Sequence, residues 1–169
     1  GDLIAIAAID EPTAESRMTP ASSLSQTESG WHLQGEKYWI SAGASATHFV
    51  VLADSCNGLA WVLVAKEAAG LSCETFPTHD GKGGANCHFD LAISDDQILL
   101  MGDAAADALS AFRECAMVLS SAETLGAAQA ALDTTVDYTK QREQFGQPLA
   151  SFQALQHRMA NMLIQTELT

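Results

Sequence analysis

The sequence predicts an α+β protein arranged by segments, with an antiparallel β-barrel or β-sandwich domain followed by two long helices of an incomplete helical bundle. Nine of the 12 glycines fall within residues 1–100, among short runs rich in β-branched and aromatic residues, a pattern typical of strands and turns. Residues 103–169 hold only two glycines and repeat apolar residues at helical spacing. The change occurs at Leu100–Asp103, so we expect one domain at residues 1–101 and a second at residues 102–169.

The first part contains about seven expected strands, a number that favours a sandwich or a small barrel. Gly35-Glu36 is expected to form the tight turn of a hairpin between two of these strands. Thr13–Glu28, which contains Pro20 and several serines, is expected to be a polar loop. The candidate strands are Leu3–Ile9, Trp31–Gln34, Lys37–Ser41, His48–Ala53, Leu59–Ala65, Leu71–Phe76, Cys87–Leu91 and, at the end of this part, Gln97–Leu99.

The second part is expected to form two helices. The first covers about Ala104–Gln141, and the only charge within Cys115–Leu132 is Glu123. A helix that is apolar on nearly all sides must be enclosed by several partners. The second helix starts near Ala150, after the break at Gly146–Pro148, and one helix cannot enclose the first. We therefore expect the chain either to oligomerise or to lack the rest of its bundle.

Composition and charge exclude several classes of protein. Eight Lys and Arg residues against 21 Asp and Glu residues give a net charge of −13, which makes nucleic acid and anionic membrane surfaces poor partners. No apolar run approaches the ~18 residues that a membrane helix needs. The sequence opens on Gly1 without an initiator Met or a signal peptide, so we expect a fragment of a cytoplasmic protein.

The four cysteines, Cys56, Cys73, Cys87 and Cys115, are widely spaced and form no CxxC motif. We expect free thiols in a reducing compartment, because nothing in the sequence marks secretion. Cys87 is followed by His88, but neighbouring residues of a strand point to opposite faces. With no second pair of ligands in view, the sequence predicts no metal site.

Three segments carry longer motifs. Ala8–Ser16 reads A-I-D-E-P-T-A-E-S, and Gly35–Gly43 reads G-E-K-Y-W-I-S-A-G, followed by the apolar run Phe49–Ala53. Arg142–Met162 reads R-E-Q-F-G-Q-P-L-A-S-F-Q-A-L-Q-H-R-M-A-N-M. In this order and spacing the segments resemble the acyl-CoA dehydrogenase family, the FAD-dependent enzymes that desaturate acyl-CoA thioesters, and they cover most of the chain.

The resemblance implies a middle β-domain followed by the first two helices of a C-terminal four-helix domain, with the family's N-terminal helical domain and last helices absent. It also implies FAD as cofactor. In the family, the residue matching Trp39 packs along the flavin, the one matching Ser41 bonds near flavin N5, and the one matching Arg142 reaches FAD held mainly by a neighbouring subunit. The implied cofactor-binding residues are Ile9, Asp10, Trp39, Ile40 and Ser41 from the β-domain, and Arg142, Phe145, Phe152 and Gln153 from the helical part.

The match at Ala8–Ser16 is imperfect. Asp10 stands where the family has Thr, and Thr13 and Glu15 replace two glycines. A carboxylate is electrostatically unfavourable beside an electron-rich flavin or the polyanionic CoA. Ser16 keeps the residue that lies near CoA in the family, so the resemblance makes it a candidate substrate contact.

The catalytic base is not identified in this sequence. Most of the family places a Glu beyond the matched region, and a minority place it at the position of Ala116, whose methyl group cannot take a proton. Glu114 matches a family acid near the acyl-CoA mouth and is a second candidate substrate contact, although a solvated helix charge is the alternative. Glu123 would have a raised pKa if it were buried, and the alternative there is a contact with a missing helix or subunit.

Three functions remain open. The first is α,β-dehydrogenation of an acyl-CoA thioester in a homo- or hetero-oligomer, with electron-transfer flavoprotein or a similar acceptor. The second is an acyl-CoA oxidase-like flavoenzyme, which keeps the fold and differs in oxygen access. The third is a non-catalytic partner subunit of a heteromeric acyl-CoA dehydrogenase, which the altered Asp10–Ser16 segment favours.

Overall fold

The structure, a computed structural model, describes residues 3–12, 20–28 and 30–168. The chain divides into two compact units, Gly1–Leu109 and Ser110–Thr169. No helix in the described ranges is long and apolar enough to cross a membrane.

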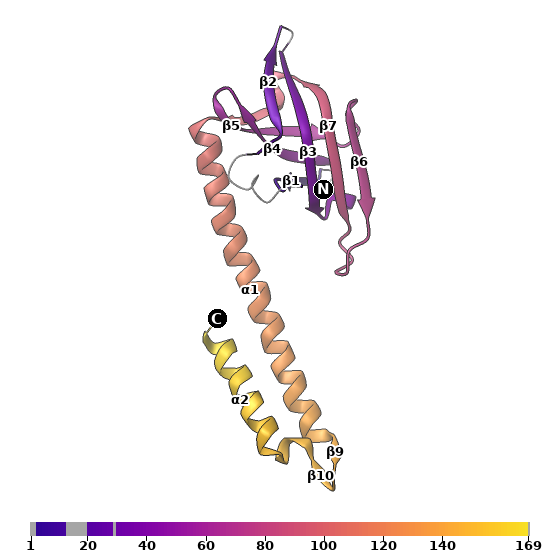
Figure 1. Cartoon of the computed structure of the whole chain (residues 1–169), viewed down its shortest axis with the longest axis vertical. Helices are drawn as coiled ribbons and strands as arrows, with labels where there is room; N and C mark the ends of the chain where they lie inside the picture. The colour runs from indigo at the N-terminus through magenta and orange to yellow at the C-terminus, as the bar shows by residue number, and fades with distance from the viewer. Residues whose placement is uncertain (1–2, 13–19, 29, 169) are drawn as a thin grey trace. The chain divides into compact units, whose positions relative to one another are not determined.

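Eight strands of the first unit form one sheet in the order β6-β7-β3-β2-β4-β5-β8, with β1 attached to β4 (Figure 1). β1 and β2 run parallel to β4, and the other strand pairs are antiparallel. The expected β-domain is confirmed, as a mixed sheet that does not close into a barrel. The strands are β1 (Ala5–Ala8), β2 (Ser23–Thr27), β3 (Gly30–Ser41), β4 (His48–Ser55), β5 (Gly58–Ala65), β6 (Leu71–Phe76), β7 (Gly84–Ile93) and β8 (Ile98–Met101), with short 3-10 turns at Gly43–Ser45 and Asp95–Gln97.

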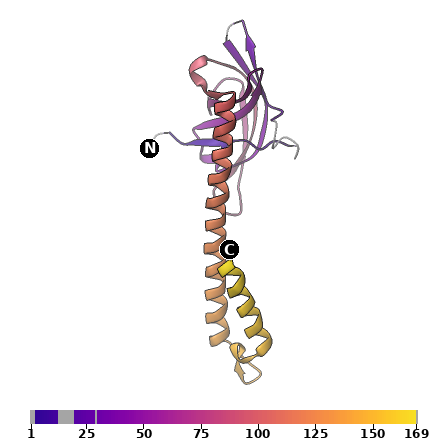
Figure 2. The ribbon, with the colours of Figure 1, turned by 90° about the vertical axis from the view of Figure 1, so that its left-hand side faces the viewer.

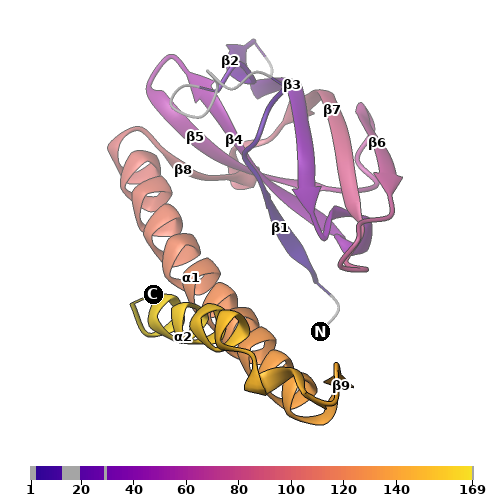
Figure 3. The ribbon, with the colours of Figure 1, turned by 60° about the horizontal axis from the view of Figure 1, so that its bottom comes forward.

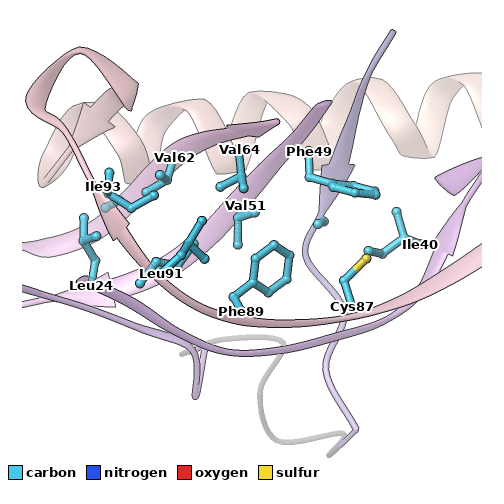
Figure 4. Packing of buried hydrophobic residues seen from close by; sticks show 14 of the residues in the cluster. Leu24, Ile40, Phe49, Val51, Val62, Val64, Cys87, Phe89, Leu91 and Ile93 are labelled. Carbon is cyan, nitrogen blue, oxygen red and sulfur yellow. The ribbon is translucent and has the colours of Figure 1, made fainter. Parts of the chain in front are cut away.

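The core of this unit lies between two parts of the curved sheet. Figure 3 shows β4 and β5 on one side and β3, β7 and β6 on the other. In Figure 4 the side chains of Phe49, Val62 and Val64 point toward Phe89 and Leu91 of the opposite part. Each fully buried aliphatic or phenyl side chain contributes about 1.5–3 kcal/mol, so this cluster holds the sheet in its bent form.

Two local predictions are wrong. The expected hairpin at Gly35-Glu36 does not exist, because β3 runs through it from Gly30 to Ser41. Gly35 instead allows Ser22 to lie close against β3, since a Cβ at Gly35 would lie 2.4 Å from the Ser22 Oγ atom. The segment expected to be a polar loop contains β2, which pairs with β3 because Leu24 enters the core.

Both predicted helices are confirmed. The first is α1 (Asp103–Gln141) and the second is α2 (Gln153–Leu168), preceded by the short strands β9 (Glu143–Gln144) and β10 (Gln147–Pro148) and by a 3-10 turn at Leu149–Ser151. Figures 1 and 2 show α2 running back beside the later part of α1. The Thr139 hydroxyl donates to the Met159 sulfur at 3.4 Å.

The apolar residues of α1 are only partly covered in this chain. Met117, Val118 and Leu119 are all exposed, although they follow one another on a helix. One partner helix therefore leaves several faces of α1 open, as the distribution of apolar residues predicts.

The expectation that all four cysteines are free thiols is wrong. Cys73 of β6 lies directly opposite Cys87 of β7, and the two form a disulfide with a Cα–Cα distance of 4.2 Å. Cys56 and Cys115 are free and exposed. Cys87 is buried whereas the adjacent His88 is exposed, so these two side chains do lie on opposite faces of their strand.

Candidate functional site

The alternation of β3 changes at Trp39. Leu33 and Lys37 face the core, and a regular strand would turn Trp39 to the same side. Instead the pairing with β7 shifts between Lys37 and Ile40, which is a β-bulge, and Trp39 has a φ of +53°. Its indole is therefore 71% exposed, while Ile40 takes the core position.

Two neighbours hold Trp39 in this arrangement. Its backbone N–H donates to Asn86 Oδ1 at 3.0 Å, and its ring meets the Phe76 ring edge-on with centroids 5.2 Å apart. Gly84 lies opposite Phe76 and leaves room for that ring, since a Cβ there would lie 2.5 Å from the Phe76 Cε2 atom. Left-handed backbone at a non-glycine residue concentrates at functional sites, so the exposed indole marks a candidate binding surface.

The segment Ile9–Glu11 lies against β3 at the same point. The Tyr38 N–H donates to the Asp10 carbonyl at 2.8 Å, and the Lys37 ammonium donates to the Ile9 carbonyl at 3.2 Å. The Ile9 side chain is half-buried and that of Asp10 is exposed. The predicted residues Ile9, Asp10 and Trp39 thus come from neighbouring stretches of backbone in one unit.

A buried ion pair underlies this contact. Lys37 Nζ lies 2.5 Å from Glu11 Oε1, with the two side chains 0% and 2% exposed. Burial raises the pKa of Glu11, but hydrogen bonds from Lys37, Ser22 and Ala21 outweigh it and hold that pKa below its ordinary value. Burial lowers the pKa of Lys37, against the opposing effect of the hydrogen bond and charge of Glu11 and the charge of Asp10.

The second group of predicted residues lies at the connection between α1 and α2. The Arg142 carbonyl accepts from the Leu149 N–H at 2.8 Å, which closes the connection. Phe145 has a φ of +55° and is 92% exposed, with its ring edge-on to Phe152 at a centroid distance of 6.2 Å. Arg142 and Gln153 are also exposed, so this connection presents a cation, an amide and aromatic rings together.

The other candidates are placed less favourably or lie elsewhere. Ile40 is a core residue, so any contact it makes with a ligand is through its backbone, whereas Ser41 is exposed. Glu114 and Glu123 are both exposed on α1, so the contact of Glu123 with a missing helix or subunit stays a prediction. Ser16 lies outside the described residues.

Four residues around the site were not singled out as site residues from the sequence. Asn86 and Phe76 support Trp39, and Lys37 and Glu11 fasten the preceding segment. The sequence feature that could have indicated these residues was Lys37, which stands two positions before Trp39. A charged residue there is expected to be solvated, unless the strand buries it beside an acid.

Comparison with known proteins identifies the family. The middle-domain model of the acyl-CoA dehydrogenases matches residues 7–94, and their C-terminal-domain model matches residues 104–169. The chain belongs to the acyl-CoA dehydrogenase family. More narrowly, its two parts correspond in order to the middle and C-terminal domains of that family.

Two curated relatives illustrate the similarity. The 3-sulfinopropanoyl-CoA desulfinase of Paraburkholderia xenovorans (strain LB400) is 33% identical over 99% of this chain and 46% of its own length. The probable acyl-CoA dehydrogenase YngJ of Bacillus subtilis (strain 168) is 30% identical over 80% of this chain and 38% of its own. The chain thus spans less than half the length of these relatives.

Solved structures with the same fold include two that carry paired names, one of which is described as a complex. A variant of the Tcur3481-Tcur3483 steroid ACAD matches with a TM-score of 0.83 and 32% identity, over 99% of this chain and 44% of that one. The ChsE4-ChsE5 complex of Mycobacterium tuberculosis matches with a TM-score of 0.83 and 25% identity, over 98% and 44%. An FAD-dependent dehydrogenase matches with a TM-score of 0.86 and 25% identity, over 97% and 47%.

Proposed function

We propose that the whole protein binds FAD and removes the α and β hydrogens of an acyl-CoA thioester. The observation that carries this proposal is the exposed indole of Trp39, fixed beside Ile9 and Asp10 by a bulge that turns it out of the core. A large aromatic ring held in solvent at a backbone cost is hard to explain by packing alone. Family membership and the Bacillus subtilis relative, named a probable acyl-CoA dehydrogenase, support this reaction class. The Paraburkholderia xenovorans relative is named for an acyl-CoA substrate but for a desulfinase reaction, so it supports the substrate class alone.

The residues of the chain fit an isoalloxazine and a pyrophosphate. The flat face of Trp39 suits the ring system, and the exposed Ser41 hydroxyl offers a hydrogen bond at its edge. The Arg142 guanidinium matches pyrophosphate oxygens in a two-pronged hydrogen bond, and Phe145 and Gln153 are also exposed at or next to the connection between α1 and α2. We propose that Arg142 of one copy contacts the pyrophosphate of FAD bound by the β-domain of another copy, as the family resemblance implies.

The bound FAD supplies the hydride acceptor. The chain's own part is to bind and orient: Trp39 and Ile9 cover the ring and exclude water, and Arg142 neutralises phosphate charge. We assign the base that takes the α proton to no residue of this chain, because Ala116 has no titratable group and Glu114 is exposed. When bound, FAD would pass its electrons on to electron-transfer flavoprotein or a similar acceptor. We also propose that the protein acts in the cytoplasm.

A non-catalytic role in a heteromer is the second candidate. It is favoured by Asp10, whose exposed carboxylate lies where the flavin would approach and would repel an electron-rich ring. Two similar structures carry paired names, and one of them is a complex. In this case the chain would supply Arg142 and its neighbours to a cofactor held mainly by a partner.

The absorbance of the purified whole protein tests both candidates. A yellow homomer whose 450 nm band bleaches when an acyl-CoA is added without air supports the first, and hydrogen peroxide formed in air would indicate the oxidase-like alternative. Trp39→Ala should lose FAD, whereas Trp31→Phe, changed at an indole that bonds Asp95 instead, should keep it. A colourless homomer that becomes yellow only with a partner supports the second candidate, and thioester turnover without flavin bleaching contradicts dehydrogenation.

A further inference from the structure

The Glu11 carboxylate accepts hydrogen bonds from two other segments of the chain. It accepts from Lys37 Nζ at 2.5 Å, from the Ala21 N–H at 2.7 Å, and from the Ser22 N–H and hydroxyl at 3.0 and 2.7 Å. Ser22 itself is buried and wedged over Gly35 of β3. One carboxylate thus fixes the segment that enters at Ile9, the segment that starts β2, and β3.

The ion pair lies directly beside the two contacts that align the flavin-facing segment. Lys37 holds the Ile9 carbonyl through its ammonium, and the next residue, Tyr38, holds the Asp10 carbonyl through its N–H. Trp39 then begins the bulge. Two consecutive carbonyls are therefore fastened to two consecutive residues of β3, immediately before the exposed indole.

Stability alone does not account for a buried ion pair at this place. Removing two charges from water offsets much of their attraction, so an apolar pair of similar volume is often as stable or more stable. What an apolar pair cannot do is direct four donors to one point. The arrangement of Glu11 therefore sets geometry, which a cofactor-binding surface requires to within about 0.5 Å.

We propose that Glu11 and Lys37 are positioning residues for the cofactor surface: their ion pair holds Ile9 and Asp10 in register with Trp39. This inference rests on the proposed binding of FAD, but its first consequence does not. Without the pair, the Tyr38 N–H loses its fixed partner at Asp10 whether or not a cofactor is bound.

The experiment compares four variants of the whole protein with FAD. Lys37→Met and Glu11→Gln each leave a buried charge or donor unpaired, so both should lower the unfolding midpoint as well as FAD affinity. The double variant Lys37→Met/Glu11→Gln leaves no buried charge, and its unfolding midpoint should return most of the way. Its FAD affinity should stay at least ten-fold weaker, and its Tyr38 amide should exchange hydrogen at least ten-fold faster. Asp90→Asn, which removes the carboxylate charge from the exposed His32–Asp90 pair of β3 and β7, is the matched control and should change neither the Tyr38 amide exchange nor the FAD affinity.

The outcomes separate the two levels of the argument. A double variant that keeps both wild-type FAD affinity and a protected Tyr38 amide shows that the pair acts only through stability, and this overturns the inference. A wild-type protein that binds no FAD overturns the proposed function. In that case a Tyr38 amide that exchanges faster in the double variant still supports the role of Glu11 and Lys37 in alignment, and an unchanged amide contradicts it.

Discussion

Glycine should be better tolerated than alanine at Trp39, against the usual order in strands. A residue with a Cβ in left-handed backbone costs roughly 1–2 kcal/mol, and Trp39 has a φ of +53°. Glycine avoids this cost but loses about 0.5–1 kcal/mol to chain entropy relative to alanine. We expect Trp39→Gly to be more stable than Trp39→Ala by about 0.5 kcal/mol, after these opposing effects are combined.

Tyr38 provides the matched control, because it precedes Trp39 in β3 and has no positive φ. There Tyr38→Gly should be less stable than Tyr38→Ala by about 0.5–1 kcal/mol. The chain-entropy cost cancels between the two sites, so the difference of differences isolates the left-handed backbone and should be about 1–2 kcal/mol.

The assay is urea unfolding followed by far-ultraviolet circular dichroism, which does not depend on the indole that is removed. Because Trp39 is mostly exposed, Trp39→Ala itself should cost only about 1 kcal/mol, mainly from its contact with Phe76. A buried Trp would cost roughly 3–5 kcal/mol. Equal glycine–alanine differences at both sites, or a cost near that of a buried Trp, would refute the bulge that places the indole in solvent.

Three further predictions follow from single contacts. Reduction of the Cys73–Cys87 disulfide by a dithiol should lower the free energy of unfolding by about 3 kcal/mol, because the bond closes a loop across 14 residues. Alkylation followed by mass spectrometry checks the bond itself: of the four cysteines of this chain, two should be labelled before reduction and all four after it. The folded-state pKa of Glu11 lies below its ordinary 4.5, so its stabilising contribution is fully present above that pH and is lost as the pH falls through the lower folded-state pKa. As the pH is lowered below 4.5, the free energy of unfolding measured in urea melts should therefore fall more in wild type than in Glu11→Gln. Gly35→Ala should lower the free energy of unfolding by at least ~2 kcal/mol, because its Cβ would lie 2.4 Å from the buried Ser22. The control is Gly81→Ala, whose Cβ meets nothing within 4 Å. It should cost only about 1 kcal/mol, and urea melts measure both values.

Local patterns predicted the elements whose signals lie within one stretch of chain. The helices α1 and α2 follow from apolar spacing and from the break between them, and β4 and β5 follow from two β-rich runs around a short turn. The resemblance carried by the motifs also reached the correct family. These are features that neighbouring residues determine largely by themselves.

Features that depend on distant residues were not predictable in the same way. Gly35-Glu36 has the composition of a turn, but the need for glycine comes from Ser22, which crosses β3 there. Cys73 and Cys87 are 14 residues apart, and only the pairing of β6 with β7 places them opposite one another. In both cases the missing information was the register of strands, which a single sequence does not encode locally.

Several departures from ordinary strand structure occur together between Lys37 and Trp39, and their concentration in one place supports a functional role. Within three residues the chain buries an ammonium, breaks the alternation of a strand, and holds a large aromatic side chain in solvent with left-handed backbone. Each feature works against stability on its own, and natural sequences tolerate such conflicts mainly at functional sites. Along β4 and β5, by contrast, facing residues such as Val51 and Val62 simply fill the core. The three conflicts have one common result, an indole presented beside the Ile9–Asp10 backbone, which is why we place the cofactor surface there.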